Sequence, residues 1–263
     1  MRLTTWNVNS VRLRTGHLPA LIEATRADVL CLQETKVIDE AFPRDAFAEL
    51  GYRHQMIAGQ KNHNGVAILS RLPIDKSASR VWCERADCRH ASITLENGIE
   101  IHDFYVPAGG DIPDPDENPK FAHKLAFLRE MAAYFRKRRP RNAPIVLVGD
   151  LNVAPLENDV WSHKQLLDVV SHTPIEVALL GDVMKSYSFL DAVRRFVPPE
   201  QRLYTWWSYR AQDWAKSDRG RRLDHVWVSP ALEGRLRAAH VHKAARDWTP
   251  PSDHVPVTVE IEG

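Results

Sequence analysis

The stretch Ile145-Val146-Leu147-Val148-Gly149-Asp150-Leu151-Asn152 decides the fold of this chain. Its first four residues are apolar and mostly β-branched, which predicts a strand that is buried on both faces. A glycine, a carboxylate and a carboxamide follow, and Asp150 and Asn152 point to the same side if the backbone stays extended. A simple turn is the alternative, because Gly, Asp and Asn are all common in loops. If other predicted strands also end in polar side chains, the site interpretation is favoured over the simple turn.

The overall composition is that of an ordinary globular protein. Of the 263 residues, 44% are hydrophobic and 26% are charged, which is enough for a large core. We find no linker, composition break or internal repeat, so we predict a single domain over residues 1–263. The 35 basic and 34 acidic side chains leave a net charge of +1. Binding to nucleic acid would therefore require a local basic cluster.

The cysteines and the hydropathy pattern give an expectation for the compartment. Cys31, Cys83 and Cys88 form an odd and sparse set, which fits a reducing environment better than a disulfide framework. No apolar run approaches the length of a membrane span, and residues 1–5 lead directly into a strand. We expect a cytoplasmic protein that has no membrane partner.

Strand-like segments occur along the whole chain, interleaved with a few helices. The clearest is a hairpin over residues 92–106, in which Asn97-Gly98 predicts a two-residue primed turn. Apolar residues spaced three to four apart predict helices near residues 18–22 and over 42–52 and 121–135. The other predicted strands are 3–8, 29–32, 65–69, 145–148, 223–228 and 255–261. Two mixed sheets packed face to face, with helices outside, accommodate both the hairpin and the doubly buried strands.

Six strand ends or junctions carry polar side chains: Asn7, Glu34, Tyr105, Asp150 with Asn152, Asp224, and Asp253 with His254. If they converge at one edge of the stacked sheets, Glu34, Asn7 and Asp253 offer only oxygen ligands, which suits Mg²⁺ or Mn²⁺. The histidine, tyrosine and remaining carboxylates can then handle protons and charge. Such a set is what metal-assisted phosphoryl transfer needs.

Each of these groups also has a structural interpretation when it is taken alone. Glu34 could be a surface residue, Asp224 could cap a turn, and Asp253-His254 could be a salt-bridged pair at the start of a strand. The recurrence of such groups at strand ends favours a common site.

Six motifs in series resemble one known family. They are Trp6-Asn7-Val8-Asn9-Ser10, Leu32-Gln33-Glu34-Thr35-Lys36, Tyr105-Val106-Pro107, Gly149-Asp150-Leu151-Asn152-Val153-Ala154-Pro155, Arg222-Leu223-Asp224 and Ser252-Asp253-His254-Val255-Pro256. Together, from Trp6 to Pro256, they resemble the exonuclease III family of DNA-repair nucleases and abasic-site endonucleases. The resemblance implies an α/β fold, the four-layer α/β sandwich of the wider DNase I-like superfamily.

The resemblance also implies a role for each matching residue. Glu34 is then the main metal ligand, assisted by Asn7 with Asp253 nearby. Asp150 activates or aligns the attacking water, and Asn152 holds that water and the phosphate in line. The same resemblance extends the possible metal ligands to Asp150, Asn152 and His254.

Four further residues act on the substrate in this interpretation. His254 donates to a phosphate oxygen, and Asp224 fixes its tautomer. Tyr105 bonds to the phosphate or to the leaving oxygen. Trp206 lies against the base-less sugar and Leu223 lines the same pocket, although plain core packing would also explain Trp206.

Two local basic clusters are candidates for contacts with DNA phosphates. One comprises Arg219, Arg221 and Arg222 beside the Asp224 strand. The other comprises Arg85, Arg89 and His90. By contrast, the loop over residues 111–119 is acidic and would repel phosphates unless it points away.

We therefore expect a divalent-metal nuclease that acts as a monomer at the nucleoid, on duplex DNA with abasic sites or 3′ ends. It would cleave the phosphodiester 5′ to an abasic site and trim 3′ ends, as an exonuclease and as a 3′-end phosphodiesterase or phosphatase. One alternative is a phosphatase or phosphodiesterase of the same fold for a small phosphoester, because fold does not determine substrate. Another is a nucleic-acid-binding regulator without catalysis, which would be expected to have lost its ligands.

Overall fold

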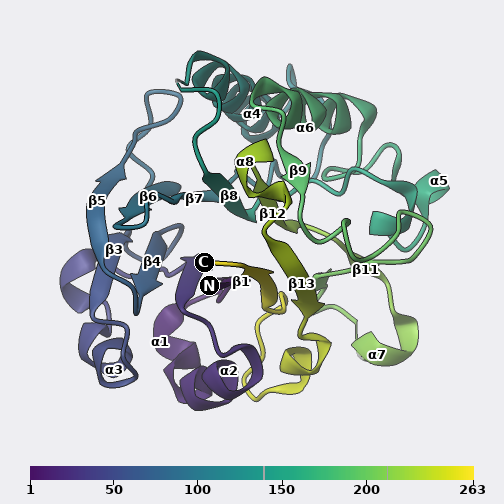
Figure 1. The fold of residues 1–263 in the computed structure, drawn as a ribbon. Coiled ribbons are helices and arrows are strands. Elements are labelled where there is room, and N and C mark those ends of the chain that lie inside the picture. Colours follow the sequence, from purple (N-terminus) through teal and green to yellow (C-terminus); the bar gives the residue numbers. More distant parts are fainter. Residues whose placement is uncertain (139, 212) are drawn as a thin grey trace.

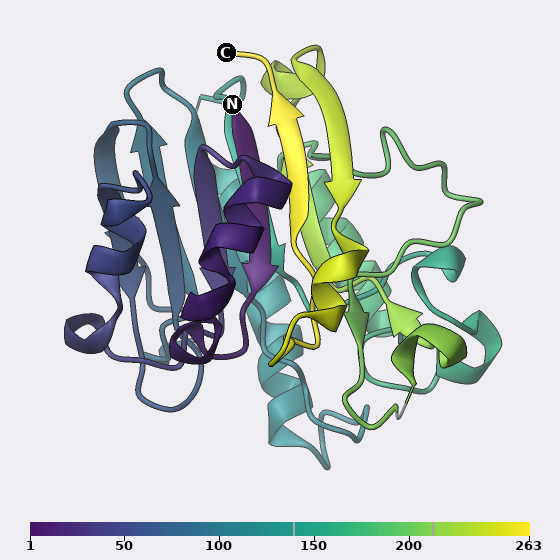
Figure 2. The ribbon, with the colours of Figure 1, turned by 90° about the horizontal axis from the view of Figure 1, so that it is seen from below.

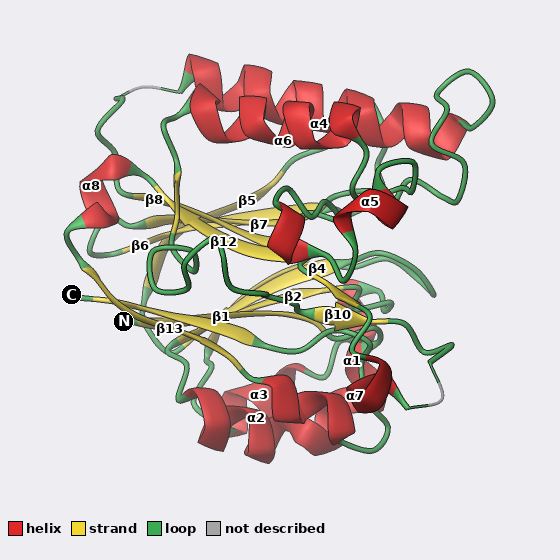
Figure 3. Ribbon diagram, turned by 90° about the vertical axis from the view of Figure 1, so that its right-hand side faces the viewer, coloured by secondary structure: helices red, strands yellow, loops and turns green. Residues whose placement is uncertain are grey.

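The computed structural model describes residues 1–138, 140–211 and 213–263. Two mixed six-stranded sheets pack face to face, and helices cover the outer face of each, which gives the four layers visible in Figure 3. The predicted fold class is therefore confirmed.

The first sheet contains both ends of the chain. Its strands, in spatial order, are β13 (Leu236–Val241), β14 (Val257–Ile261), β1 (Arg2–Asn7), β2 (Val29–Gln33), β4 (Val66–Ser70) and β3 (His54–Ala58). Figure 2 shows β14 beside β1, near the two termini. This pairing supports the single-domain interpretation, which remains a prediction.

The second sheet contains the stretch that opened the sequence analysis. Its order is β5 (Ile74–Ser79), β6 (His90–Leu95), β7 (Glu100–Tyr105), β8 (Ile145–Asp150), β12 (Asp224–Val228) and β9 (Leu190–Asp191). Every residue of β8 is buried, as its apolar sequence predicts. A separate two-stranded ribbon pairs β10 (Trp206–Trp207) with β11 (Gly220–Arg221).

The longer helices lie outside the sheets (Figure 1). The second sheet is covered by α4 (Pro119–Lys137) and α6 (Pro174–Ser186), and the first by α2 (Leu18–Thr25) and α3 (Arg44–Glu49). Short helices are α1 (Val11–Arg14), α5 (His163–Leu166), α7 (Trp214–Ser217) and α8 (Pro230–Glu233), with 3₁₀ turns at Thr15–His17, Asp39–Ala41, Glu157–Asp159 and Lys243–Asp247. In the described part of the chain, every helix is too short or too polar to cross a bilayer.

The hairpin between β6 and β7 corrects one prediction. Leu95 N donates to Ile99 O at 2.9 Å and Gly98 N donates to Leu95 O at 2.8 Å, so the loop has three residues. Gly98 has φ +83°, whereas a primed two-residue turn would also need a positive φ at Asn97, which is not among the positive-φ residues. The chain uses a turn followed by a left-handed glycine instead.

Gly149 is required by the close approach of β7. Its φ is +131°, and a Cβ at this position would lie 2.0 Å from the Phe104 carbonyl oxygen and 2.9 Å from Asp103 Oδ1. Because both obstacles belong to a buried neighbouring strand, a side chain cannot be accommodated by a small shift.

We expect Gly149→Ala to lower the free energy of unfolding by about 3 kcal/mol or more, because the new methyl group clashes with backbone and forces an unfavourable φ. Urea denaturation followed by circular dichroism measures this. Gly181→Ala is the matched control, since Gly181 lies within α6 with open space around it, and alanine there should leave stability unchanged or slightly raised. An unchanged midpoint for Gly149→Ala would contradict the argument.

Candidate active site

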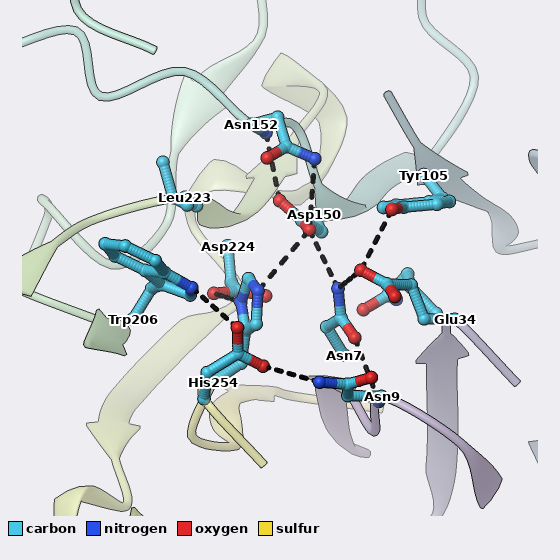
Figure 4. A network of polar contacts seen from close by, with 12 residues as sticks. Asn7, Asn9, Glu34, Tyr105, Asp150, Asn152, Trp206, Leu223, Asp224 and His254 are labelled. Carbon is cyan, nitrogen blue, oxygen red and sulfur yellow. Dashed lines mark hydrogen bonds and ion pairs between the residues drawn. The ribbon is translucent and has the colours of Figure 1, made fainter. Parts of the chain in front are cut away.

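The polar strand ends converge at one edge of the two stacked sheets. β1 and β2 run parallel, which places Asn7 beside Gln33 and therefore close to Glu34. In the facing sheet β7 and β8 are also parallel and place Tyr105 beside Asp150. The antiparallel strand β12 begins where β8 ends, so Asp224 lies opposite Asp150. Figure 4 shows these side chains pointing toward one another.

Asn7 connects the two sheets at the centre of this edge. Its Nδ2 donates to Glu34 Oε1 and to Asp150 Oδ2, both at 2.9 Å. The Tyr105 hydroxyl donates to the same Glu34 oxygen at 2.9 Å, and Lys36 Nζ lies 2.8 Å from the other. Glu34 is thus held from both sheets.

Asp150 and Asn152 face each other, but not through an extended backbone. Asn152 has φ +53°, and its amide N–H donates to Asp150 Oδ1 at 3.0 Å, which closes a tight turn. Its Nδ2 contacts Asp150 Oδ2 at 3.2 Å and Val106 O at 2.9 Å. This stretch therefore does contain a turn, and the turn itself brings the two side chains together, while their catalytic role remains a prediction. Glu34 also has a left-handed backbone, with φ +51°, and such strain is typical of functional sites.

His254 lies between two carboxylates. Its Nδ1 donates to Asp224 Oδ2 at 2.8 Å, and its Nε2 lies 3.7 Å from Asp150 Oδ2. Thr205 Oγ1 donates to the same Asp224 oxygen at 2.5 Å and accepts from the Asp224 amide at 3.1 Å. All of these side chains are buried, so the imidazole is fixed in both position and orientation.

Burial and the neighbouring charges shift the pKa values of three site residues. Burial raises the pKa of Asp150, and the nearby Asp224 raises it further against the opposing effect of His254. For His254, burial lowers the pKa, but Asp224 and Asp150 outweigh this and the net shift is upward. For Glu34, burial raises the pKa, but Lys36 and the Asn7 hydrogen bond reverse this, so the carboxylate stays ionised. The site therefore combines a proton donor, a proton acceptor and a fixed anion.

A cavity of about 600 Å³ opens directly onto these groups. Glu34, Asp150 and His254 line it on one side, and Trp206 and Leu223 on another. The Trp206 indole N–H donates to Asp253 Oδ2 at 2.9 Å, while Asn9 Nδ2 donates to Asp253 Oδ1 at 3.1 Å. Trp206 is only half-buried, so it packs on the core with one part and faces the cavity with another.

The basic clusters are placed differently from one another. Arg219 and Arg221 line the cavity and stack over Trp161 and Trp206, with guanidinium-to-ring distances of 4.6 and 5.4 Å. The expectation that Arg222 binds DNA is wrong, because it is fully buried in ion pairs with Asp159 and Asp191.

The second cluster also contains both accessible and buried residues. Arg85 is exposed, and the half-buried Arg89 stacks on the Tyr105 ring at 4.8 Å. His90 is buried against His102, so its predicted contact with phosphates is wrong. In the acidic loop, Asp111 lines the cavity, while Asp114, Asp116 and Glu117 are exposed.

Three contributors were not singled out by the sequence reasoning. Lys36 and Asn9 contact the carboxylates of Glu34 and Asp253, respectively, and Thr205 supports Asp224. Asn9 and Lys36 belong to two of the six quoted motifs, and Thr205 directly precedes Trp206, so this position in the sequence was the signal that could have found them. Side-chain contacts between segments far apart in the chain cannot be predicted from the local sequence pattern.

The donor set at Glu34 fits a hard divalent cation. Glu34 and Asp150 supply carboxylate oxygens from the two sheets, and Lys36 Nζ lies beside the outer oxygen of Glu34. Asn7 turns its amide nitrogen to both carboxylates, and its Oδ1 accepts from the Asn9 amide at 3.0 Å. Ligand atoms of Asp150, Asp224 and His254 also lie within 4.8 Å of one another. In that group, however, the raised pKa of His254 keeps the imidazole positive, so the carboxylates are already neutralised. A protonated imidazole has no free lone pair for a metal, so we favour Glu34 as the first ligand, with Asn7 next to it.

Comparison with known proteins identifies the family. Residues 4–254 match the model of the endonuclease/exonuclease/phosphatase family. The chain belongs to the endonuclease/exonuclease/phosphatase family. Exodeoxyribonuclease III of Haemophilus influenzae is 30% identical, with both chains covered in full.

Two solved structures of the same fold align over their whole length. An AP endonuclease from Archaeoglobus fulgidus superposes with a TM-score of 0.92 at 29% identity, with 100% of each chain covered. A 3′ phosphatase from Neisseria, NExo, bound to a product DNA hairpin, also gives 0.92 at 30% identity and the same coverage.

These findings confirm the resemblance to exonuclease III and the expectation of an enzyme. The chain is a phosphodiester hydrolase of the nuclease type within the endonuclease/exonuclease/phosphatase family. That family is metal-dependent, and the acidic cluster at the sheet edge could bind a metal.

Proposed function

We propose that this enzyme cleaves duplex DNA 5′ to abasic sites, leaving a 3′-hydroxyl, and that it trims 3′ ends as an exonuclease and 3′-end phosphodiesterase or phosphatase. The single observation that supports this best is that two groups of catalytic side chains flank Asp150 at one cavity. The Asp224–His254 pair lies on one side of Asp150, and Glu34 with Asn7 lies on the other. A phosphate placed between them meets a proton acceptor, a proton donor and a metal ligand at once.

Asp150 and Asn152 act on the attacking water in this mechanism. The raised pKa of Asp150 makes it a better base than an exposed aspartate, so it takes a proton from the water as the bond to phosphorus forms. Asn152 orients the water, because its own amide is fixed by Asp150 and by the carbonyl of Val106. A divalent cation held by Glu34 and assisted by Asn7 would polarise the phosphate and stabilise its growing charge.

His254 and Tyr105 act on the phosphate itself. His254 carries its proton on Nε2 while Asp224 holds Nδ1, so it donates to a non-bridging oxygen as negative charge develops. Burial raises the pKa of Tyr105 well above its ordinary value, and the nearby Glu34 and Asp150 reinforce this, so the hydroxyl stays protonated and can donate to the phosphate or the leaving oxygen.

The cavity supports a sugar-phosphate substrate. Trp206 and Leu223 offer an apolar wall for a deoxyribose that lacks its base, and Arg221 and Arg219 offer positive charge for phosphates. A small phosphoester would use the catalytic edge without needing this wall, which is why we place DNA first. We also propose a single domain that acts as a cytoplasmic monomer; the three free cysteines fit that compartment.

A substrate panel tests the proposal. We expect incision of an abasic-site duplex and removal of matched 3′ nucleotides and 3′-phosphates, with Mg²⁺ or Mn²⁺, and a 3′-hydroxyl at the abasic incision. Inositol phosphates should be hydrolysed poorly or not at all. Preferential hydrolysis of inositol phosphates would favour the small-phosphoester alternative. Duplex binding without cleavage under any divalent ion would favour the non-catalytic one.

Glu34→Gln tests the proposed metal site. The amide keeps the shape but removes the charge that attracts the cation, so we expect the half-saturating Mg²⁺ concentration for incision to rise about 10-fold or more. Isothermal titration with Mn²⁺, which does not depend on turnover, should show the same weakening. Glu117→Gln, in the exposed acidic loop, is the matched control. Unchanged Mn²⁺ affinity in Glu34→Gln would contradict Glu34 as a ligand.

A further inference from the structure

Lys124 and Glu176 form an ion pair in the interior of the protein, outside the catalytic edge. Lys124 belongs to α4 and Glu176 to α6, two helices that pack side by side (Figure 1) over the second sheet. Both side chains are fully buried. Burial of two charges costs desolvation free energy, and apolar replacements are often as stable, so the pair is poorly explained by stability alone.

The ammonium group of Lys124 reaches two loops of the active site. Its Nζ donates to the backbone carbonyl of Asn152 at 2.7 Å and to that of Ala108 at 3.2 Å. Gly109 leaves the space for this approach, since a Cβ there would lie 2.9 Å from Lys124 Cδ. Lys124 thereby ties the loop after β7 to the loop after β8.

The carboxylate of Glu176 holds a third loop. Its two oxygens accept from the Ser171 amide, both at 2.9 Å, and Oε2 also accepts from Thr173 Oγ1 at 2.7 Å. Ser171 Oγ in turn accepts from Arg221 Nη1 at 2.8 Å, in the cavity wall. Glu176 also caps the start of α6 through Thr173, but that cap does not require a lysine partner.

We propose that the buried Lys124–Glu176 pair is a positioning element that holds Asn152 at the catalytic edge. Asn152 has a left-handed backbone, which asparagine tolerates better than most residues, so its contacts must select this one conformation and hold it. The Lys124 ammonium holds the Asn152 carbonyl from the side of α4. Asp150 and Val106 hold the Asn152 amide N–H and side chain on the side of the cavity. This inference rests on the proposed function, because it assigns Lys124 an effect on turnover that passes through Asn152.

Lys124→Met tests the inference, because methionine fills the space of the stem without the charge. We expect kcat for incision of an abasic-site duplex to fall about 30-fold, since a small misplacement of a positioned group is costly. KM, and the dissociation constant for the duplex measured by anisotropy with Ca²⁺, should change by less than about 3-fold, because Lys124 lies behind the cavity wall. Lys124→Arg should restore most of kcat, and Lys137→Met, an exposed lysine at the end of the same helix, should behave like the wild type.

A double-mutant cycle separates positioning from a general structural role. In an Asn152→Ala background, Lys124→Met should lower kcat by less than about 3-fold, because the side chain that it positions is gone. Rates are normalised to the folded fraction from circular dichroism. If Lys124→Met does not fold, Lys124→Met/Glu176→Gln avoids the unpaired buried charge and takes its place.

The outcomes that contradict the inference differ from those that contradict the function. A folded Lys124→Met enzyme with the wild-type kcat would overturn the positioning role, as would an undiminished 30-fold loss in the Asn152→Ala background. A wild-type protein that fails to incise abasic duplex under either metal would instead overturn the proposed function.

Discussion

Asp150→Asn is expected to lower the single-turnover rate of abasic-site incision by about 10⁴-fold, at the upper end of what loss of a general base costs. The asparagine can still accept from the Asn152 amide, so the turn should survive. It cannot accept a proton from the attacking water, and it removes the negative charge that faces His254. Quenched-flow measurement on a duplex with one abasic site, at saturating enzyme and Mg²⁺, gives the rate.

Asp116→Asn is the matched control for this variant. Asp116 is an exposed aspartate in the loop over residues 111–119, so its replacement should change the rate by less than about 2-fold. Circular dichroism should show both variants folded. If folded Asp150→Asn retained more than a tenth of the wild-type rate, the assignment of Asp150 as the base would fail.

His254→Gln is expected to lower the same rate by about 10³-fold, because it removes the proton donor for the developing charge on the phosphate. Asp224→Asn should cost about 10²-fold, since the imidazole remains but loses the partner that fixes its Nδ1 proton and raises its pKa. Both rates come from the same single-turnover assay.

The pair of variants should be strongly non-additive. Asp224 acts through His254, so His254→Gln/Asp224→Asn should be no slower than His254→Gln within about 3-fold. His240→Gln, at an exposed histidine on β13, is the control and should keep the wild-type rate. If the two single effects multiplied in the double variant, Asp224 would need a role independent of His254.

The strands found from the sequence and those that were missed differ in one physical property. Among the residues that the structure describes, the eight strands inside the two sheets were all predicted. Some, such as β8 and β2, are continuous apolar runs buried on both faces, and others, such as β6 and β7, were visible from alternation and a turn. The four edge strands, β13, β3, β5 and β9, were not predicted. β5, Ile74–Ser79, is almost entirely exposed, and its polar sequence pairs with only one neighbour.

A similar distinction holds for the basic residues. Arg221 and Arg222 are adjacent and look alike in the sequence, yet one lines the cavity and the other is buried between Asp159 and Asp191. Successive residues of an extended chain point to opposite sides, and which side faces the cavity depends on distant segments.

The sequence by itself determined the interior strands, the polar residues at their ends and the family to which their motifs belong. These features follow from local rules of burial and from motif residues that can be read in order along the chain. Only the tertiary structure decided how the opening stretch works. The buried strand predicted over residues 145–148 forms and extends to Asp150, but the chain leaves it at Asn152 through a left-handed turn and not along an extended path. That turn depends on Asp150, Val106 and Lys124, and Lys124 comes from α4, the helix that covers the outer face of the second sheet. Contacts of this kind depend on how segments remote in the chain pack together, so no local pattern contains them.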